Sequence, residues 1–186
     1  MEKKEFKGNF LTFKNRLLSK FLLMFGVALF VFLIFLVKIS HINILSILFF
    51  LLIISPILPI LFNCVIWIDS ATIENAKVTF GGYKFDQKFT KEFNIEDVSV
   101  KIKSTGSKWN RDYYLEFHTP NDTFSVNRLQ SWDYKILVKL FREFKNSKNE
   151  KVIFDDEYWL DVMEKKAMGM TSWKAVMNKG NNNNAT

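Results

Sequence analysis

Apolar residues form one long block near the start of the chain and alternate with polar residues after it. Across residues 21–68 the only charged side chain is Lys38. Residues 21–37 would make a helix about 26 Å long, close to the roughly 30 Å hydrocarbon core of a bilayer. Residues 42–68 form a second and longer apolar run. The pattern predicts two membrane-spanning helices, at about 21–37 and 42–68.

A short polar segment divides this block. Residues 38–41 are typical of a turn between two antiparallel helices, because Lys38 can extend its stem toward the headgroups. One continuous helix is the alternative, but the block is far longer than a single span needs. A cleaved signal peptide fits poorly, because no small-residue cleavage site follows the first run. In the second run, Pro56 and Pro59 remove two backbone donors and are expected to kink the helix.

Basic residues beside the block predict its orientation. Residues 1–20 carry a net charge of +4, whereas the turn holds one lysine. The positive-inside rule then places both termini in the cytoplasm, as in a multi-pass protein of the plasma (inner) membrane. Apolar residues also recur at helical spacing in this arm: Phe6, Phe10, Phe13 and Leu17. The arm is therefore expected to be a basic amphipathic helix at the membrane interface, or else an unstructured basic tail.

The period of the pattern changes to strict alternation after residue 68. Val78 and Phe80 precede Gly81 and Gly82, and further aromatic residues follow, which predicts a two-residue hairpin turn at the glycines. Three more alternating runs cover residues 98–103, 113–118 and 124–127, and turn residues join them. This is the pattern of an antiparallel meander with one buried face.

One amphipathic helix is expected to close the meander. Ser131 is a good N-cap, Asp133 suits the first turn, and Asn146 marks the end. The helix carries an apolar stripe: Tyr134, Leu137, Val138, Phe141 and Phe144. Four basic residues lie off that stripe: Lys135, Lys139, Arg142 and Lys145.

The order of elements over residues 21–146 resembles that of bacterial two-span membrane proteins with a pleckstrin-homology-like cytoplasmic domain. Residues 93–98 (FNIEDV) look like the aromatic-x-x-x-acidic-aliphatic entry to that family's mid-domain strand, and Trp132 also fits. Six candidate strands are found where that fold has seven. The resemblance implies a barrel-like sheet capped by a helix over residues 69–148, which serves as a binding or scaffolding module without catalytic residues.

Residues 149–180 are predicted to form a helical extension, and residues 181–186 a disordered tail. Asp155 can cap a helix, with Asp156 and Glu157 in its first turn. Met and Trp residues recur on one helical face: Trp159, Met163, Met170, Trp173 and Met177. This stripe either packs back on the domain or docks a partner, because Met and Trp suit adaptable interfaces. The predicted fold class is therefore a membrane α-hairpin plus an α+β domain with a helical extension.

Catalytic, metal-binding and cofactor-binding patterns are not evident in the sequence. The single cysteine, Cys64, lies in the apolar block, and the two histidines, His41 and His118, have no ligand-like neighbours. The acidic run 155–157 is explained by the helix start. One basic-aromatic patch at a hairpin end could contact anionic lipid or be an ordinary solvated edge: Lys101, Lys103, Lys108, Trp109 and Arg111.

The functional hypothesis is a non-enzymatic, membrane-anchored interaction or scaffold module that holds its domain at the cytoplasmic face. The expected partners are membrane lipids and either another protein or a second copy of the chain. Nucleic acid is not expected, because the basic excess is mostly in the arm beside the apolar block, and no small-molecule substrate is evident. The alternatives are a self-assembling subunit of a membrane pore or transport machine, and a toxin-immunity or regulatory membrane protein.

Overall fold

Strands dominate the part of the chain that the computed structural model describes, which is residues 3–18, 64–107, 110–127 and 131–170 with Gly26, Phe30 and Ser55. The elements are β1 (Lys4–Lys7), β2 (Ile66–Glu74), β3 (Lys77–Lys84), β4 (Gln87–Asn94), the 3-10 turn η1 (Ile95–Asp97), β5 (Ser99–Ser107), β6 (Asn110–His118), β7 (Thr123–Val126), α4 (Tyr134–Ser147) and α5 (Phe154–Ala167). Residues 13–18 are also helical.

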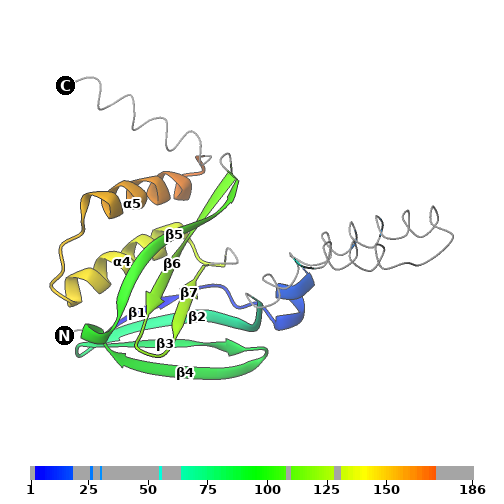
Figure 1. The fold of residues 1–186 in the computed structure, drawn as a ribbon, viewed down its shortest axis with the longest axis horizontal. Helices are drawn as coiled ribbons and strands as arrows, with labels where there is room; N and C mark the ends of the chain where they lie inside the picture. The colour runs from blue at the N-terminus through cyan, green and yellow to red at the C-terminus, as the bar shows by residue number, and fades with distance from the viewer. Residues whose placement is uncertain are drawn as a thin grey trace, which may run out of the picture. The chain divides into compact units, whose positions relative to one another are not determined.

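The described strands form two sheets. One has the order β1-β2-β3-β4, and the other has the order β5-β6-β7 (Figure 1). β1 pairs antiparallel with β2, with Phe6 opposite Ala71. β5 pairs antiparallel with β6, and β6 with β7. Helix α4 contacts both β1 and β6, so it packs against one strand of each sheet.

The chain divides into two compact units, one of residues 1–10, 67–83 and 88–186, and the other of residues 11–66 and 84–87. Aromatic side chains fill the core of the first unit. The ring of Phe80 lies 4.9 Å from that of Phe117 and 5.2 Å from that of Phe124, and Phe117 meets Phe144 of α4 at 5.4 Å. Burying each such side chain contributes roughly 1.5–3 kcal/mol, so these contacts hold both sheets and α4 together.

In the described part of the second unit, the side chain of Arg16 is fully buried. Its guanidinium donates to the carbonyl oxygens of Cys64, at 2.9 Å, and of Phe85. Asp86 lies 3.7 Å away, and its carboxylate accepts from the backbone N–H of Phe13 at 2.7 Å. Desolvation by burial lowers the pKa of Arg16, while Asp86 opposes that shift.

The predicted fold class of a two-span membrane protein is wrong. In the described part of the chain, none of the helices has the length and apolar sequence needed to cross a bilayer. Ile66, Trp67 and Ile68, expected at the end of the second span, begin strand β2 instead. Most of the rest of the proposed hairpin, including Pro56 and Pro59, lies outside the described residues. The resemblance to membrane-anchored pleckstrin-homology-like proteins and the multi-pass inner-membrane localisation both depended on those spans, and both are withdrawn.

The continuous apolar run concealed the start of β2. A buried strand and a helical span are both apolar without interruption, so periodicity alone does not separate them. Trp67 and Ile68 are buried, at 4% and 3% exposure, and Ile66 is half exposed. The polar alternation that identifies this strand begins only after residue 68.

The N-terminal arm also differs from expectation, because residues 4–7 form a strand and not a helix. Phe6 is buried in the core, whereas Glu5 and Lys7 are exposed. β1 lies before residues 21–68, and β2 begins at the end of that block and continues beyond it, so the two paired strands come from opposite ends of the block. A pairing between segments about sixty residues apart leaves no local signal in the sequence.

The other strands and both helices largely follow the sequence pattern. The meander strands are confirmed as β5, β6 and β7, and the closing helix as α4. The predicted turn at Gly81 and Gly82 is wrong, because both glycines lie inside β3. The chain turns instead at residues 75–76 and 85–86, where Asn75, Ala76 and Phe85 adopt positive φ.

Candidate functional site

Within the described ranges, no three His, Cys, Asp or Glu side chains are close enough to bind a metal ion. The sequence analysis missed one neighbour of His118: Nε2 of the ring lies 2.8 Å from Oε1 of Glu116, and the two form an ion pair when the imidazole is protonated. The acidic run 155–157 lies at the start of α5, as predicted, but Asp155 is not the cap: it lies in the first turn, and the N-cap residue is Ile153.

Helix α4 instead presents an open surface. Its N-cap is Asp133, whose carboxylate accepts from the backbone N–H of Lys135 at 2.8 Å. Ser131, the predicted cap, is buried, and its carbonyl accepts from the N–H of Asn9 at 2.9 Å. Because the inner face of α4 is buried, Lys135 and Lys139 point outward, one turn apart, and both are exposed.

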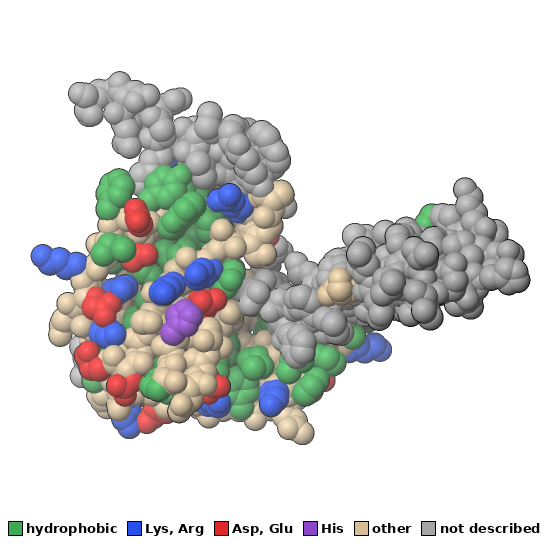
Figure 2. Space-filling view, in the orientation of Figure 1, with side chains coloured by type: hydrophobic (Ala, Val, Ile, Leu, Met, Phe, Trp, Pro, Cys, Tyr) green, Lys and Arg blue, Asp and Glu red, His purple; other side chains and the backbone are tan. Residues whose placement is uncertain are grey.

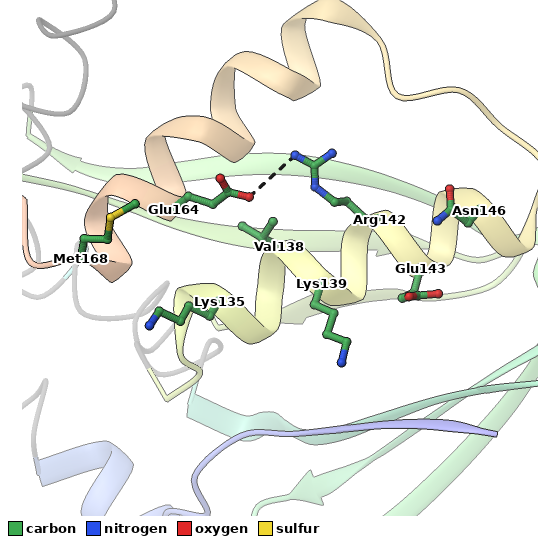
Figure 3. A pocket seen from close by; sticks show the side chains of 8 residues that line it. All are labelled: Lys135, Val138, Lys139, Arg142, Glu143, Asn146, Glu164 and Met168. Atoms are coloured by element: carbon green, nitrogen blue, oxygen red, sulfur yellow. Dashed lines mark ion pairs between the residues drawn. The ribbon is translucent and has the colours of Figure 1, made fainter. Parts of the chain in front are cut away.

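A groove runs along α4 beside α5, with a volume of about 490 Å³. We call it the α4 groove, and its lining residues are Lys135, Val138, Lys139, Arg142, Glu143, Asn146, Glu164 and Met168 (Figure 3). Val138 and Met168 give it an apolar part, and the Met168 side chain is 68% exposed. Arg142 lies 3.7 Å from Glu164 of α5.

A second hollow, of about 370 Å³, separates α4 from strand β1. We call it the β1 hollow, and it is lined by Glu5, Phe6, Lys7, Lys135, Ile136 and Lys139. Lys135 and Lys139 therefore border both hollows. In Figure 3 the Lys139 side chain points away from α5. The two lysines form a basic ridge between an apolar groove and a strand edge.

Most basic side chains near this ridge already have acidic partners. Lys4 pairs with Glu143 at 2.5 Å, Lys7 with Glu5 at 3.1 Å, and Arg142 with Glu157 at 2.9 Å. Figure 2 shows acidic and basic side chains interspersed in the same way over the face in view.

Lys135 and Lys139 differ from these neighbours, because their side chains make no ion pair or hydrogen bond with any described residue. Like charges four residues apart destabilise a helix slightly. Their arrangement therefore has no structural benefit within this part of the chain.

The outer edge of β1 is open among the described strands, because β1 is the terminal strand of its sheet. Gly8 N–H donates to the Asp69 carbonyl at 2.8 Å, and residues 8 and 69 continue the register of β1 with β2. Hydrogen-bonded pairs alternate along an antiparallel ladder. Phe6 thus bonds toward β2, while the backbone groups of Glu5 and Lys7 face the β1 hollow.

The basic-aromatic patch predicted from the sequence is only partly described. Lys101 and Lys103 are exposed on β5, the edge strand of its sheet among the described strands. Arg111 lies on β6, and its carbonyl accepts a hydrogen bond from Lys166. Lys108 and Trp109 lie outside the described residues, so contact of this patch with anionic lipid stays a prediction.

The predicted Met/Trp stripe packs inward wherever it can be seen. Met163 is fully buried, and the Trp159 ring lies 5.6 Å from that of Tyr113. Met170 packs against the same core. Trp173 and Met177 lie beyond the described residues, so docking by that end of the stripe remains untested.

Sequence reasoning missed the ridge. It placed Lys135 and Lys139 off the apolar stripe of α4 but gave them no role. The available signal was two like charges at helical spacing; the acidic residue four positions after Lys139, Glu143, pairs with Lys4 of β1 instead. The strand edge that completes the site could not be inferred, because the sequence pattern predicted a helix or an unstructured tail at residues 4–7.

Comparison of the chain with protein-family models, curated proteins and solved structures found no match.

Proposed function

We propose that this protein is a non-enzymatic interaction module that binds a protein partner along the Lys135–Lys139 ridge. The observation that carries the proposal is the position of these two lysines, which border both hollows and lack an ionic partner in the described structure. Exposed charges with no internal partner favour complementary charge on a ligand. The partner surface is therefore expected to be acidic.

The surroundings of the ridge favour a polypeptide over a nucleic acid. Glu143, Glu157 and Glu164 lie beside it and hold the neighbouring basic side chains. These carboxylates would repel a continuous phosphate backbone, whose binding needs several basic contacts. A polypeptide can place apolar groups on Val138 and Met168 and acidic groups on the lysines.

Affinity capture of the tagged full-length protein from its own cells tests the proposal. The charge-reversed variant Lys135→Glu/Lys139→Glu is compared with Lys88→Glu/Lys151→Glu, which changes two exposed lysines outside the ridge and shifts the net charge equally. We expect a specific protein to be recovered with the wild type and the control and to be lost with the ridge variant. Recovery of the same proteins with all three chains would contradict the proposal.

A further inference from the structure

We infer that the segment bound in the β1 hollow is an extended acidic stretch of the partner, which adds to the open edge of β1 as another strand. This inference rests on the proposed function and specifies the chemistry of its ligand. Three features of the hollow carry it: the direction of the β1 backbone groups, the face of β1 that adjoins α4, and the spacing of the two lysines.

The backbone of β1 supplies the first feature. Glu5 and Lys7 direct their N–H and C=O groups to the side of β1 away from β2, where the hollow lies. An unpaired edge of this kind is a template for another strand. An extended peptide placed there gains main-chain hydrogen bonds to both residues, which is the mode of strand addition.

The second feature fixes which side chains of the bound strand face α4. Lys4 and Phe6 share one face of β1, and Lys4 pairs with Glu143 of α4 at 2.5 Å. Residues directly opposite each other in paired strands project to the same face. The ligand residues opposite Lys4 and Phe6 therefore project toward α4, where Ile136 and the two lysines line the hollow.

The third feature is a match of spacings. Lys135 and Lys139 are four positions apart on α4, which is a distance of about 6 Å along the helix axis. Two residues of a strand cover about 6.6–6.8 Å. Acidic side chains at alternate positions of an extended ligand can therefore meet both lysines at once, and the intervening residues face outward.

A second copy of β1 is a poorer occupant of this edge. Two copies would bring four lysines of the ridge together, and the chain already carries a formal net charge of +7. Self-pairing would add like-charge repulsion with no new acidic residue at the ridge. Charge complementarity therefore selects an acidic ligand.

The probe is a fluorescent peptide of about ten residues in which glutamate alternates with valine, titrated into the full-length protein by anisotropy. In antiparallel pairing with glutamates toward the lysines, the valine N–H groups donate to β1. We expect N-methylation of the valines to weaken binding by about tenfold or more, and N-methylation of the glutamates to have little effect. Equal effects of the two methylation patterns, or none, would overturn strand addition.

Variants of the protein separate this inference from the proposed function. Glu5→Pro removes an N–H that faces the hollow, and Glu5→Ala keeps that N–H while removing the same carboxylate. We expect Glu5→Pro to lose binding of the glutamate–valine peptide and Glu5→Ala to keep it, with the circular dichroism spectra of both variants the same as that of the wild type. Binding that is lost in Lys135→Glu/Lys139→Glu but kept in Glu5→Pro would refute the added strand and leave the interaction module standing. If Lys135→Glu/Lys139→Glu binds the peptide as the wild type does, both the added strand and the interaction module are refuted. If light scattering detects a dimer that Glu5→Pro abolishes, the edge of β1 is occupied by a second copy of the chain and not by an acidic ligand.

Discussion

Arg16 shows how one side chain can join segments that are far apart in the sequence. Its guanidinium holds the carbonyls of Cys64 and Phe85, which are far apart in the sequence. A fully buried guanidinium has lost its hydration, which is costly unless hydrogen bonds replace it. Because Phe85 adopts positive φ in the turn before β4, the arginine also satisfies a carbonyl that the tight turn leaves available.

We predict that Arg16→Met destabilises the protein by about 2–3 kcal/mol, since the buried carbonyl of Cys64 and the part-buried carbonyl of Phe85 both lose their donor. The matched control is Lys14→Met, an exposed position in the same short helix. Urea denaturation monitored by tryptophan fluorescence measures both variants. Equal midpoints for Arg16→Met and Lys14→Met would mean that the Arg16 contacts contribute nothing to stability.

Tyr134, the first residue of α4, gives a pH prediction. Its hydroxyl donates to Asp112 and accepts from the Tyr113 N–H, each at 3.2 Å. Burial raises the pKa of Tyr134 to about 12, from 10.0. The unfolded phenol then ionises first, so the free energy of unfolding should fall as pH rises from about 10 to about 12.

The fall is expected to be about 1–2 kcal/mol: each pKa unit corresponds to about 1.4 kcal/mol, and solvent screening of the partly exposed phenol reduces the total. Tyr134→Phe should lack it, and absorbance at 295 nm should show one fewer tyrosine titrating near pH 12. If the titration curves of wild type and variant have the same high-pH transition, the phenol of Tyr134 is not the shifted group.

At the scale of the element, β3 depends on two glycines with different surroundings. A Cβ on Gly82 would collide with the backbone carbonyl of Trp67 in β2, whereas a Cβ on Gly81 would meet only the hydroxyl of Ser70. A side-chain hydroxyl can rotate away, but a strand backbone cannot. Gly82 is therefore required for close approach of β3 to β2, and neither glycine forms the turn that the sequence suggested.

We predict that Gly82→Ala destabilises the protein by about 1–3 kcal/mol or more, as overpacking does in a rigid core. Gly81→Ala should cost clearly less, because Ser70 can give way. Thermal melts of the two variants compare them directly, since they place the same methyl group at adjacent positions. A larger loss for Gly81→Ala would show that β2 can move more readily than Ser70 can turn.

The elements that the sequence predicted correctly are those with local signals. Strand β6 alternates buried Tyr113, Leu115 and Phe117 with more polar residues, and α4 carries a stripe at helical spacing. Two failures concern β1 and the start of β2, which are recognisable only from their pairing across the long apolar block. The third is the turn predicted at Gly81 and Gly82, because two glycines are typical of a tight turn and also of a close strand contact. The same holds for the candidate site. The sequence predicted α4 and the exposure of its lysines, but it did not predict the strand edge that faces them.

At the scale of the whole molecule, the net charge of +7 raises an alternative explanation for any acidic ligand. A basic protein attracts acidic peptides over its entire surface, and salt screens that attraction. Salt dependence alone therefore does not locate the contact. The two charge-reversed variants separate the two effects, because each lowers the formal charge by the same amount.

We predict that raising NaCl from about 0.05 to 0.5 M weakens the wild-type complex with the glutamate–valine peptide by about tenfold or more. Lys88→Glu/Lys151→Glu should retain most of that dependence, because its ridge is intact. Lys135→Glu/Lys139→Glu should bind weakly at every salt concentration, with a nearly flat response. If the two variants lose affinity and salt dependence equally, the attraction belongs to the net charge, and the ridge has no special part in recognising the ligand.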